Sequence, residues 1–231
     1  MHLQLKTSTL PKLLICIISV LFILHCTQLI AYYVIADTDK FDFIELVDFD
    51  YEGNLPAFYS ALALFIATCL LALISRKARQ DQAPYKNHWM MLTLIFLWLM
   101  LDEALGLHEE LGDFVESLQL FKAEGYLYFA WVVPYGMLLS VFFFAYLKFT
   151  LALPSRTRSL FITSGLIFIT GAVGIETLSA READLHGSTS IMYSVLYTIE
   201  ELCEMLGIVL FIYALLDYIK KEIGTVQLTF Q

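Results

Sequence analysis

The chain has 231 residues, of which 59% are hydrophobic and 16% are charged, and its mean hydropathy is +0.71. This composition excludes an ordinary soluble domain and indicates an integral membrane protein surrounded by the lipid bilayer. The formal net charge of -9 argues against nucleic acid as a partner and against a polybasic lipid-binding patch as the main interaction.

Apolar stretches predict an all-α, polytopic transmembrane bundle of six helices, which we treat as a single transmembrane domain over residues 1–231. The first stretch could be a signal peptide or an anchor. We favour the anchor because the apolar run continues to Ile35 without a small-x-small cleavage site. The expected spans are about 13–35, 55–75, 89–107, 126–151, 160–180 and 190–218.

An acidic, aromatic loop from Ala36 to Pro56 joins the first two spans. Its Asp48, Asp50, Glu52 and Gly53 resemble the first half of an EF-hand calcium loop. The twelfth position of such a loop would be Tyr59, where calcium needs a bidentate Glu. We therefore expect a solvated acidic turn.

The basic residues predict the orientation. Three of the 14 lysines and arginines, Lys40, Lys122 and Arg181, fall in the loops assigned to the outer side. The other basic residues fall on the inner side, and they are Lys6, Lys12, Arg76, Lys77, Arg79, Lys86, Lys148, Arg156, Arg158, Lys220 and Lys221. This bias predicts cytoplasmic N- and C-termini in a bacterial inner membrane.

The last span contains three carboxylates, at Glu200, Glu201 and Glu204. At about 100° per residue they fall within roughly a 100° arc, so one side of the helix carries the charge. A charged carboxylate deep in a membrane helix costs about 2.5 to 3.5 kcal/mol on insertion scales. These acids therefore need partners, water or protons.

Further acids are expected at a similar depth on neighbouring helices. Asp102 and Glu103 end the third span, and Glu176 lies late in the fifth. We expect Pro134 to bend the fourth helix at the same level, and Gly171 and Gly174 to pack on the side of the fifth helix opposite Glu176. On a straight helix His108 would point about 140° away from Glu103. Only a helix that ends near Gly106 would bring His108 into the site.

Carboxylate and histidine ligands from facing helices are typical of di-iron and di-manganese bundle proteins, although the spacing here departs from Glu-x-x-His. We expect a divalent metal ion, iron, manganese or zinc, and a metal-dependent membrane enzyme is the corresponding function. The expected primary ligands are Glu103, Glu176, Glu201 and Glu204, with Asp102, Glu200 and His108 as direct or supporting groups.

Two other functions remain open at this point. The carboxylates could fix helix packing in an assembly subunit or scaffold of a membrane complex, in contact with other subunits. They could also serve a proton-coupled carrier, which six spans without an internal repeat disfavour.

Several residues have simpler readings. His25 is expected to be a satisfied polar contact and not a haem ligand, since no second mid-membrane histidine faces it. The four cysteines form no Cys-x-x-Cys pair and are expected to be free thiols. The acids expected to be solvated near a helix end are Glu109, Glu110, Asp113 and Glu116.

Three motifs resemble an uncharacterised family of bacterial six-span inner-membrane proteins. The likeness covers roughly Trp89 to Tyr218 and carries no established activity. The motifs are Leu101-Asp102-Glu103 with Leu107-His108-Glu109, then Gly171 to Glu176, then Glu200-Glu201 with Glu204-Met205-Leu206-Gly207. The resemblance implies only that these motifs occur together.

Overall fold

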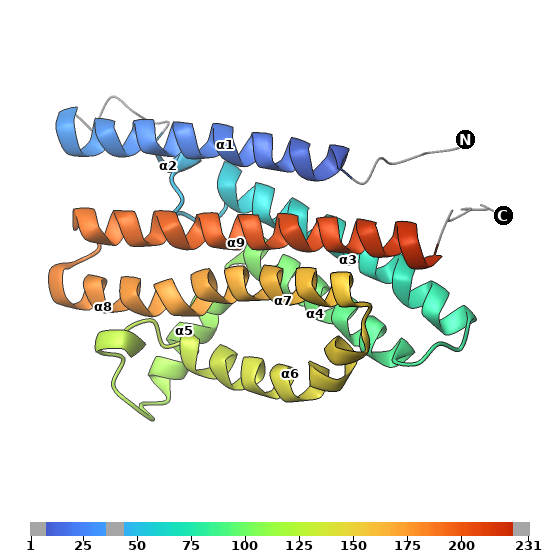
Figure 1. Ribbon diagram of the computed structural model, residues 1–231. Helices are drawn as coiled ribbons and strands as arrows, with labels where there is room; N and C mark the ends of the chain where they lie inside the picture. Colours follow the sequence, from blue (N-terminus) through green and yellow to red (C-terminus); the bar gives the residue numbers. More distant parts are fainter. Residues whose placement is uncertain (1–7, 36–43, 224–231) are drawn as a thin grey trace.

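The computed structural model describes residues 8–35 and 44–223. Within this part the chain is α-helical, with six helices that are each long and apolar enough to cross a membrane (Figure 1). The predicted all-α bundle is thus confirmed. Lys6, Lys40 and residues 36–43 of the acidic loop lie outside the described residues.

Helical hairpins build the bundle. The helices in chain order are α1 (Thr9–Ile30), α2 (Ile44–Val47), α3 (Leu55–Gln80), α4 (Lys86–Leu105), α5 (Leu107–Ser117), α6 (Val132–Ala152), α7 (Ser155–Ile169), α8 (Glu176–His186) and α9 (Ile191–Tyr218). Short π-helical segments follow α1 (Ala31–Ile35) and α9 (Ile219–Ile223) and join α7 to α8 (Thr170–Ile175), and a 3₁₀ turn (Gly125–Leu127) precedes α6.

The α9 helix is the centre of the bundle, because it packs against α1, α3, α7 and α8. Its inner side is fully buried at Met205, Ile212 and Leu215. Together with the π-helical turn after it, α9 spans 33 residues. At 1.5 Å per residue this is about 50 Å, which exceeds a hydrocarbon core of about 30 Å, so part of the helix extends beyond the bilayer.

Two glycines allow α7 and its π-helical extension to lie directly against α9. A Cβ atom on Gly207 would lie 2.9 Å from the backbone nitrogen of Phe168. One on Gly171 would lie 2.7 Å from the carbonyl oxygen of Glu200. Gly171 therefore packs on the helix that carries the acids, and Gly174 makes no such approach. The predicted division of the fifth helix into a glycine side and a carboxylate side is wrong in this respect.

The α6 helix is loosely attached. Its mid-helix apolar side chains are exposed, as expected for residues that face lipid, and include Met137, Leu138, Val141 and Phe144. The predicted bend at Pro134 does not occur, because α6 begins at Val132 and places Pro134 in its first turn. In that position proline costs no intrahelical hydrogen bond.

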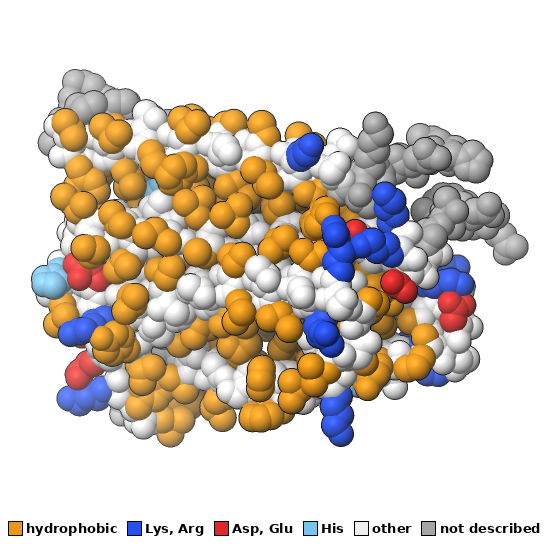
Figure 2. Space-filling model, in the orientation of Figure 1, with side chains coloured by type: hydrophobic (Ala, Val, Ile, Leu, Met, Phe, Trp, Pro, Cys, Tyr) orange, Lys and Arg blue, Asp and Glu red, His pale blue; other side chains and the backbone are white. Residues whose placement is uncertain are grey.

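The surface agrees with a membrane environment. Figure 2 shows hydrophobic side chains along the length of the bundle, and Lys and Arg gathered mainly at the end where α1 begins and α9 ends. We call this the basic end. The opposite end holds α5, the turn between α8 and α9, and the loop before α3 (Figure 1). The four cysteines, Cys16, Cys26, Cys69 and Cys203, are free thiols, as predicted.

The contact at Gly207 yields a test of the packing. Gly207→Ala forces the added methyl group into the Phe168 backbone, which cannot move without shifting α7, so we expect destabilisation of about 1 to 3 kcal/mol. Gly165→Ala is the matched control, because a Cβ there meets no atom within 4 Å. Reversible unfolding in mixed detergent micelles measures both variants. Equal stability of the two would contradict the close approach.

Candidate functional site

An acidic cavity of about 1060 Å³ lies at the end of the bundle away from the basic end. The loop before α3, the end of α4, all of α5, the segment before α6, and the outer parts of α8 and α9 form its walls. Ten acids line it, namely Asp50, Glu52, Glu103, Glu109, Asp113, Glu116, Glu124, Glu176, Glu200 and Glu201. Lys122 is the lysine of the lining, and its Nζ lies 3.6 Å from Glu124. The cavity is therefore strongly negative and attracts cations.

The end of α4 brings His108 into this cavity. Gly106 adopts a left-handed conformation with φ +61°, which ends α4 at Leu105 and starts α5 at Leu107. A side chain at this position would be strained, so glycine permits the turn. This is the helix end that the sequence analysis required for His108 to reach the site. A Cβ on Gly106 would lie 3.8 Å from atoms of Glu52 and Glu109.

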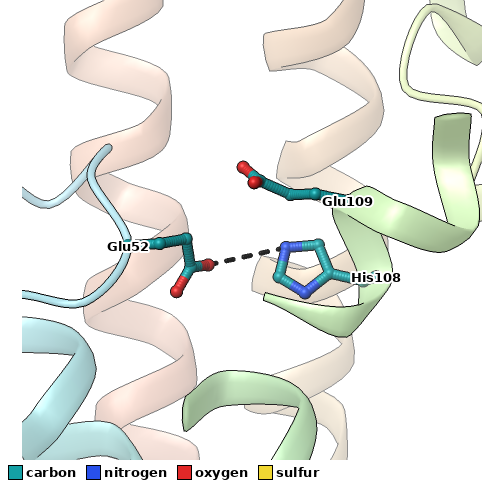
Figure 3. A group of neighbouring side chains, drawn as sticks. All are labelled: Glu52, His108 and Glu109. Atoms are coloured by element: carbon teal, nitrogen blue, oxygen red, sulfur yellow. Dashed lines mark ion pairs between the residues drawn. The ribbon is translucent and has the colours of Figure 1, made fainter. Parts of the chain in front are cut away.

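His108 stands between carboxylates on both sides of its ring. Its Nε2 lies 3.6 Å from Oε1 of Glu52, as Figure 3 shows, and its Nδ1 lies 3.7 Å from Oδ2 of Asp102. Glu109 completes a compact group, since one donor atom from each of Glu52, His108 and Glu109 lies within 4.8 Å of the others. The ring of Trp131 packs edge-on against His108 at 5.2 Å and limits its rotation.

Burial and charge shift the pKa values of the groups outside the spans. Burial raises the pKa of Glu52, and His108 offsets part of this shift. Burial alone would lower the pKa of His108, but the interaction with Asp102 and the charges of Glu52 and Glu109 outweigh it and raise the pKa. His108 and its carboxylates thus stabilise one another, as expected of a site that carries a proton when no other cation is present.

The loop before α3 is anchored and not solvated, which corrects the expected acidic turn. Asp48 is 6% exposed and accepts hydrogen bonds from Tyr197 Oη at 3.1 Å and Gln28 Nε2 at 3.1 Å. Asn54 Nδ2 donates to the carbonyl of Asp48 at 2.6 Å, while its Oδ1 caps α3 by accepting from the backbone N–H of Ala57. The loop is thereby held so that Asp50 and Glu52 face the cavity.

His25 helps to hold this loop. Its Nδ1 accepts the backbone N–H of Phe49 at 3.2 Å, its Nε2 lies 2.9 Å from Thr198 Oγ1, and its ring stacks on Phe49 at 4.3 Å. Since Nδ1 accepts, Nε2 carries the proton and donates to Thr198. The expectation of a satisfied polar contact is confirmed, with both nitrogens in use.

The residues predicted as ligands lie around the cavity but do not share one place. His108, Glu103, Glu176, Glu200 and Glu201 line it. Asp102 lies behind His108, and Glu204 lies one turn deeper on α9, with its Cγ facing Gly171. Oε2 of Glu200 accepts a hydrogen bond from Ser179 at 3.0 Å, which ties α8 to α9. In the described part of the chain, the compact group combines His108 with two acids that the sequence analysis had set aside as solvated.

Glu52 and Glu109 were missed for an identifiable reason. Each is exposed or lies in a loop, and an exposed acid next to a helix end is usually solvated. The signal that could have found them is Gly106. A helix that ends there turns the first residues of α5 back toward the cavity, so that Glu109 follows His108 into the site.

Two buried polar atoms near His108 have no hydrogen-bond partner among the described residues. They are Oδ1 of Asp102 and the hydroxyl of Tyr135, which lies beside Asp102 in the first turn of α6. Asp102 is 7% exposed, so an unsatisfied oxygen there costs about 1 to 3 kcal/mol. A water molecule or an ion next to Asp102 would remove this cost.

Comparison with known proteins provides a family but no function. A family model described as a domain of unknown function, DUF8692, matches residues 13–219. The chain belongs to the DUF8692 family. No curated protein and no solved structure matches the chain significantly. The expectation of an uncharacterised family is confirmed, while the bacterial origin and the joint occurrence of the three motifs in DUF8692 proteins remain predictions.

The loop acid Asp50 yields a prediction on pH. Burial and the nearby charges of Asp48, Glu176 and Glu109 raise its pKa from 3.8 to about 6, although Tyr193 donates a hydrogen bond to it at 2.8 Å. The folded-state pKa exceeds the unfolded value, so the fold loses stability as pH rises from about 4 to 6 and Asp50 ionises.

Asp50→Asn removes this ionisation and keeps an oxygen that can accept from Tyr193. In detergent with a chelator, we expect a higher thermal unfolding midpoint than the parent protein above pH 6, with the difference shrinking toward pH 4. Glu110→Gln, at an exposed acid outside the cavity lining, controls for the loss of one charge. A constant difference across this pH range would contradict the shifted pKa.

Proposed function

We propose that this DUF8692 protein binds a divalent metal ion in its acidic cavity, and that Glu52, His108 and Glu109 are the ligands. The supporting observation is the placement of His108, whose Nε2 faces the two glutamates while its Nδ1 faces Asp102. Metal-bound histidines commonly direct their second nitrogen at a carboxylate, which fixes the tautomer and orients the ring. The unpartnered Asp102 oxygen and the ten cavity acids favour the same reading.

The distances fit a metal after a small closure. Two ligands on opposite sides of a metal, with bonds of about 2.0 to 2.2 Å, lie about 4.0 to 4.4 Å apart. The three donor atoms lie within 4.8 Å of one another, so they need to approach by only a few tenths of an ångström. Two carboxylates and one imidazole suit manganese, iron or zinc.

Three protein ligands leave coordination positions open for water or substrate, which is the arrangement of catalytic and not structural sites. The ion would then act as a Lewis acid or lower the pKa of a bound water. The cavity volume far exceeds the needs of one ion, so a substrate has room beside it. Because the lining is dominated by acids, neutral or cationic substrates are favoured over anionic ones.

The remaining predicted acids take supporting positions in this proposal. Glu103 and Glu201 line the cavity next to the metal ligands and offer proton acceptors or further ligands, and Glu204 lies below them. Glu176 and Glu200 join α8 to α9 at the cavity wall. The basic end is placed in the cytoplasm of a bacterial inner membrane, with the cavity toward the outer side.

Metal titration of the purified, chelator-treated protein tests the function. We expect one tight site for Mn²⁺ or Co²⁺ by isothermal calorimetry. His108→Ala should abolish it, and Asp102→Asn should weaken it about 10- to 100-fold because Asn can donate to Nδ1 and place the ring proton on Nε2, where the metal binds. Asp113→Asn is the control, as an acid of the same cavity outside the compact group.

The alternatives give different outcomes. If the carboxylates only fix helix packing in a scaffold, His108→Ala and Asp102→Asn leave metal binding unchanged or absent throughout, while Glu200→Gln lowers the unfolding midpoint through loss of the Ser179 contact. If the protein is a proton-coupled carrier, liposomes containing it show uptake that depends on a pH gradient. Metal binding that survives His108→Ala would contradict the proposed ligand set.

A further inference from the structure

A second, smaller pocket of about 380 Å³ lies between α3 and α4 near the basic end. The C-terminal half of α3 and the first turns of α4 form its walls. The lining residues are Ala72, Ser75, Arg76, Arg79, Gln80, Met90, Thr93 and Leu94. Two arginines, three neutral polar residues and three apolar residues thus share one site, and the site is separate from the acidic cavity.

The charge of this pocket is not neutralised by the described protein. Lys77 pairs with Asp81 at 2.8 Å, and Asp217 pairs with Arg156 at 3.1 Å and Lys221 at 2.9 Å. The acids of the basic end are therefore engaged elsewhere. Neither pocket arginine forms an ion pair with any residue of the described ranges.

The partner of Arg79 points to a missing anion. Its guanidinium donates to the sulfur of Met90. A thioether is a weak acceptor, whereas the planar guanidinium fork matches a phosphate with two parallel hydrogen bonds. Both arginines lie on the last two turns of α3, one turn apart, so their heads can approach one phosphate from the same side.

The pocket also has the polarity profile of a lipid. Leu94 and Ala72 lie one turn or more nearer the bundle centre than Arg79 and Met90 along their respective helices. An apolar floor below a positive rim fits an acyl chain below a phosphate. Basic pockets between transmembrane helices on the cytoplasmic side are known binding places of anionic headgroups.

We propose that this pocket binds the phosphate headgroup of an anionic phospholipid through Arg76 and Arg79, with the upper part of an acyl chain along Ala72, Met90 and Leu94. The lipid would clamp the α3–α4 hairpin at the membrane surface. Since this hairpin supplies α4, which ends at Asp102, the lipid also supports the helix that carries the metal site. The proposal itself does not depend on the metal.

Native mass spectrometry of the full-length protein tests this with defined lipids. Dioleoylphosphatidylglycerol should be retained at least about tenfold better than dioleoylphosphatidylcholine. The double variant Arg76→Gln with Arg79→Gln should lose this preference. The control pair Lys148→Gln with Arg158→Gln removes the same charge from the same side but outside the pocket, and should keep the preference.

Further arms separate the explanations. Arg79→Lys keeps the charge and loses the planar fork, so it should show an intermediate preference, and it serves if the double variant does not fold. Equal loss of preference in the control pair would overturn the proposal in favour of a diffuse surface field. Displacement of the lipid by millimolar inorganic phosphate, with equal thermal protection, would overturn it in favour of a free-phosphate site.

Discussion

The structure depends on how a membrane bundle accommodates many acids at one end. Carboxylates on α4, α8 and α9 converge on one cavity with further acids from the loop before α3 and from α5. Their mutual repulsion has to be offset by protons, water or a cation. The break at Gly106 supplies part of the answer, because it turns His108 into the middle of the acids. A single backbone conformation thus decides whether the charges are merely crowded or organised around a basic nitrogen.

The loop before α3 is the second part of this arrangement. It is anchored to the outer ends of α1 and α9 by His25, Gln28 and Tyr197. A buried histidine in mid-helix therefore acts on the functional site indirectly, since it holds Phe49 and Asp48 and so positions Glu52 one turn further along the chain. Packing at Gly171 and Gly207 fixes α7 and α9 at close distance and sets the width of the cavity wall.

The helical bundle could be predicted from the sequence because apolar run length and charge position are local properties. The need for a break near Gly106 also followed from helical geometry, as did the role of His25. Glu52 and Glu109 could not be predicted as partners of His108, because the fold of the connecting loop rests on contacts between residues far apart in sequence, such as Asp48 with Tyr197. Pro134 was misjudged because the start of α6 is set by the preceding loop and not by hydropathy.

The most direct test of the central claim is the position of a bound ion in crystals grown with manganese, located by its anomalous scattering. The account predicts a peak about 2.0 to 2.3 Å from Nε2 of His108 and bonded to Glu52 and Glu109, with Asp102 facing Nδ1. A peak bound only by the deeper acids Glu103, Glu201 and Glu204, or fully loaded crystals without a peak in the acidic cavity, would contradict it.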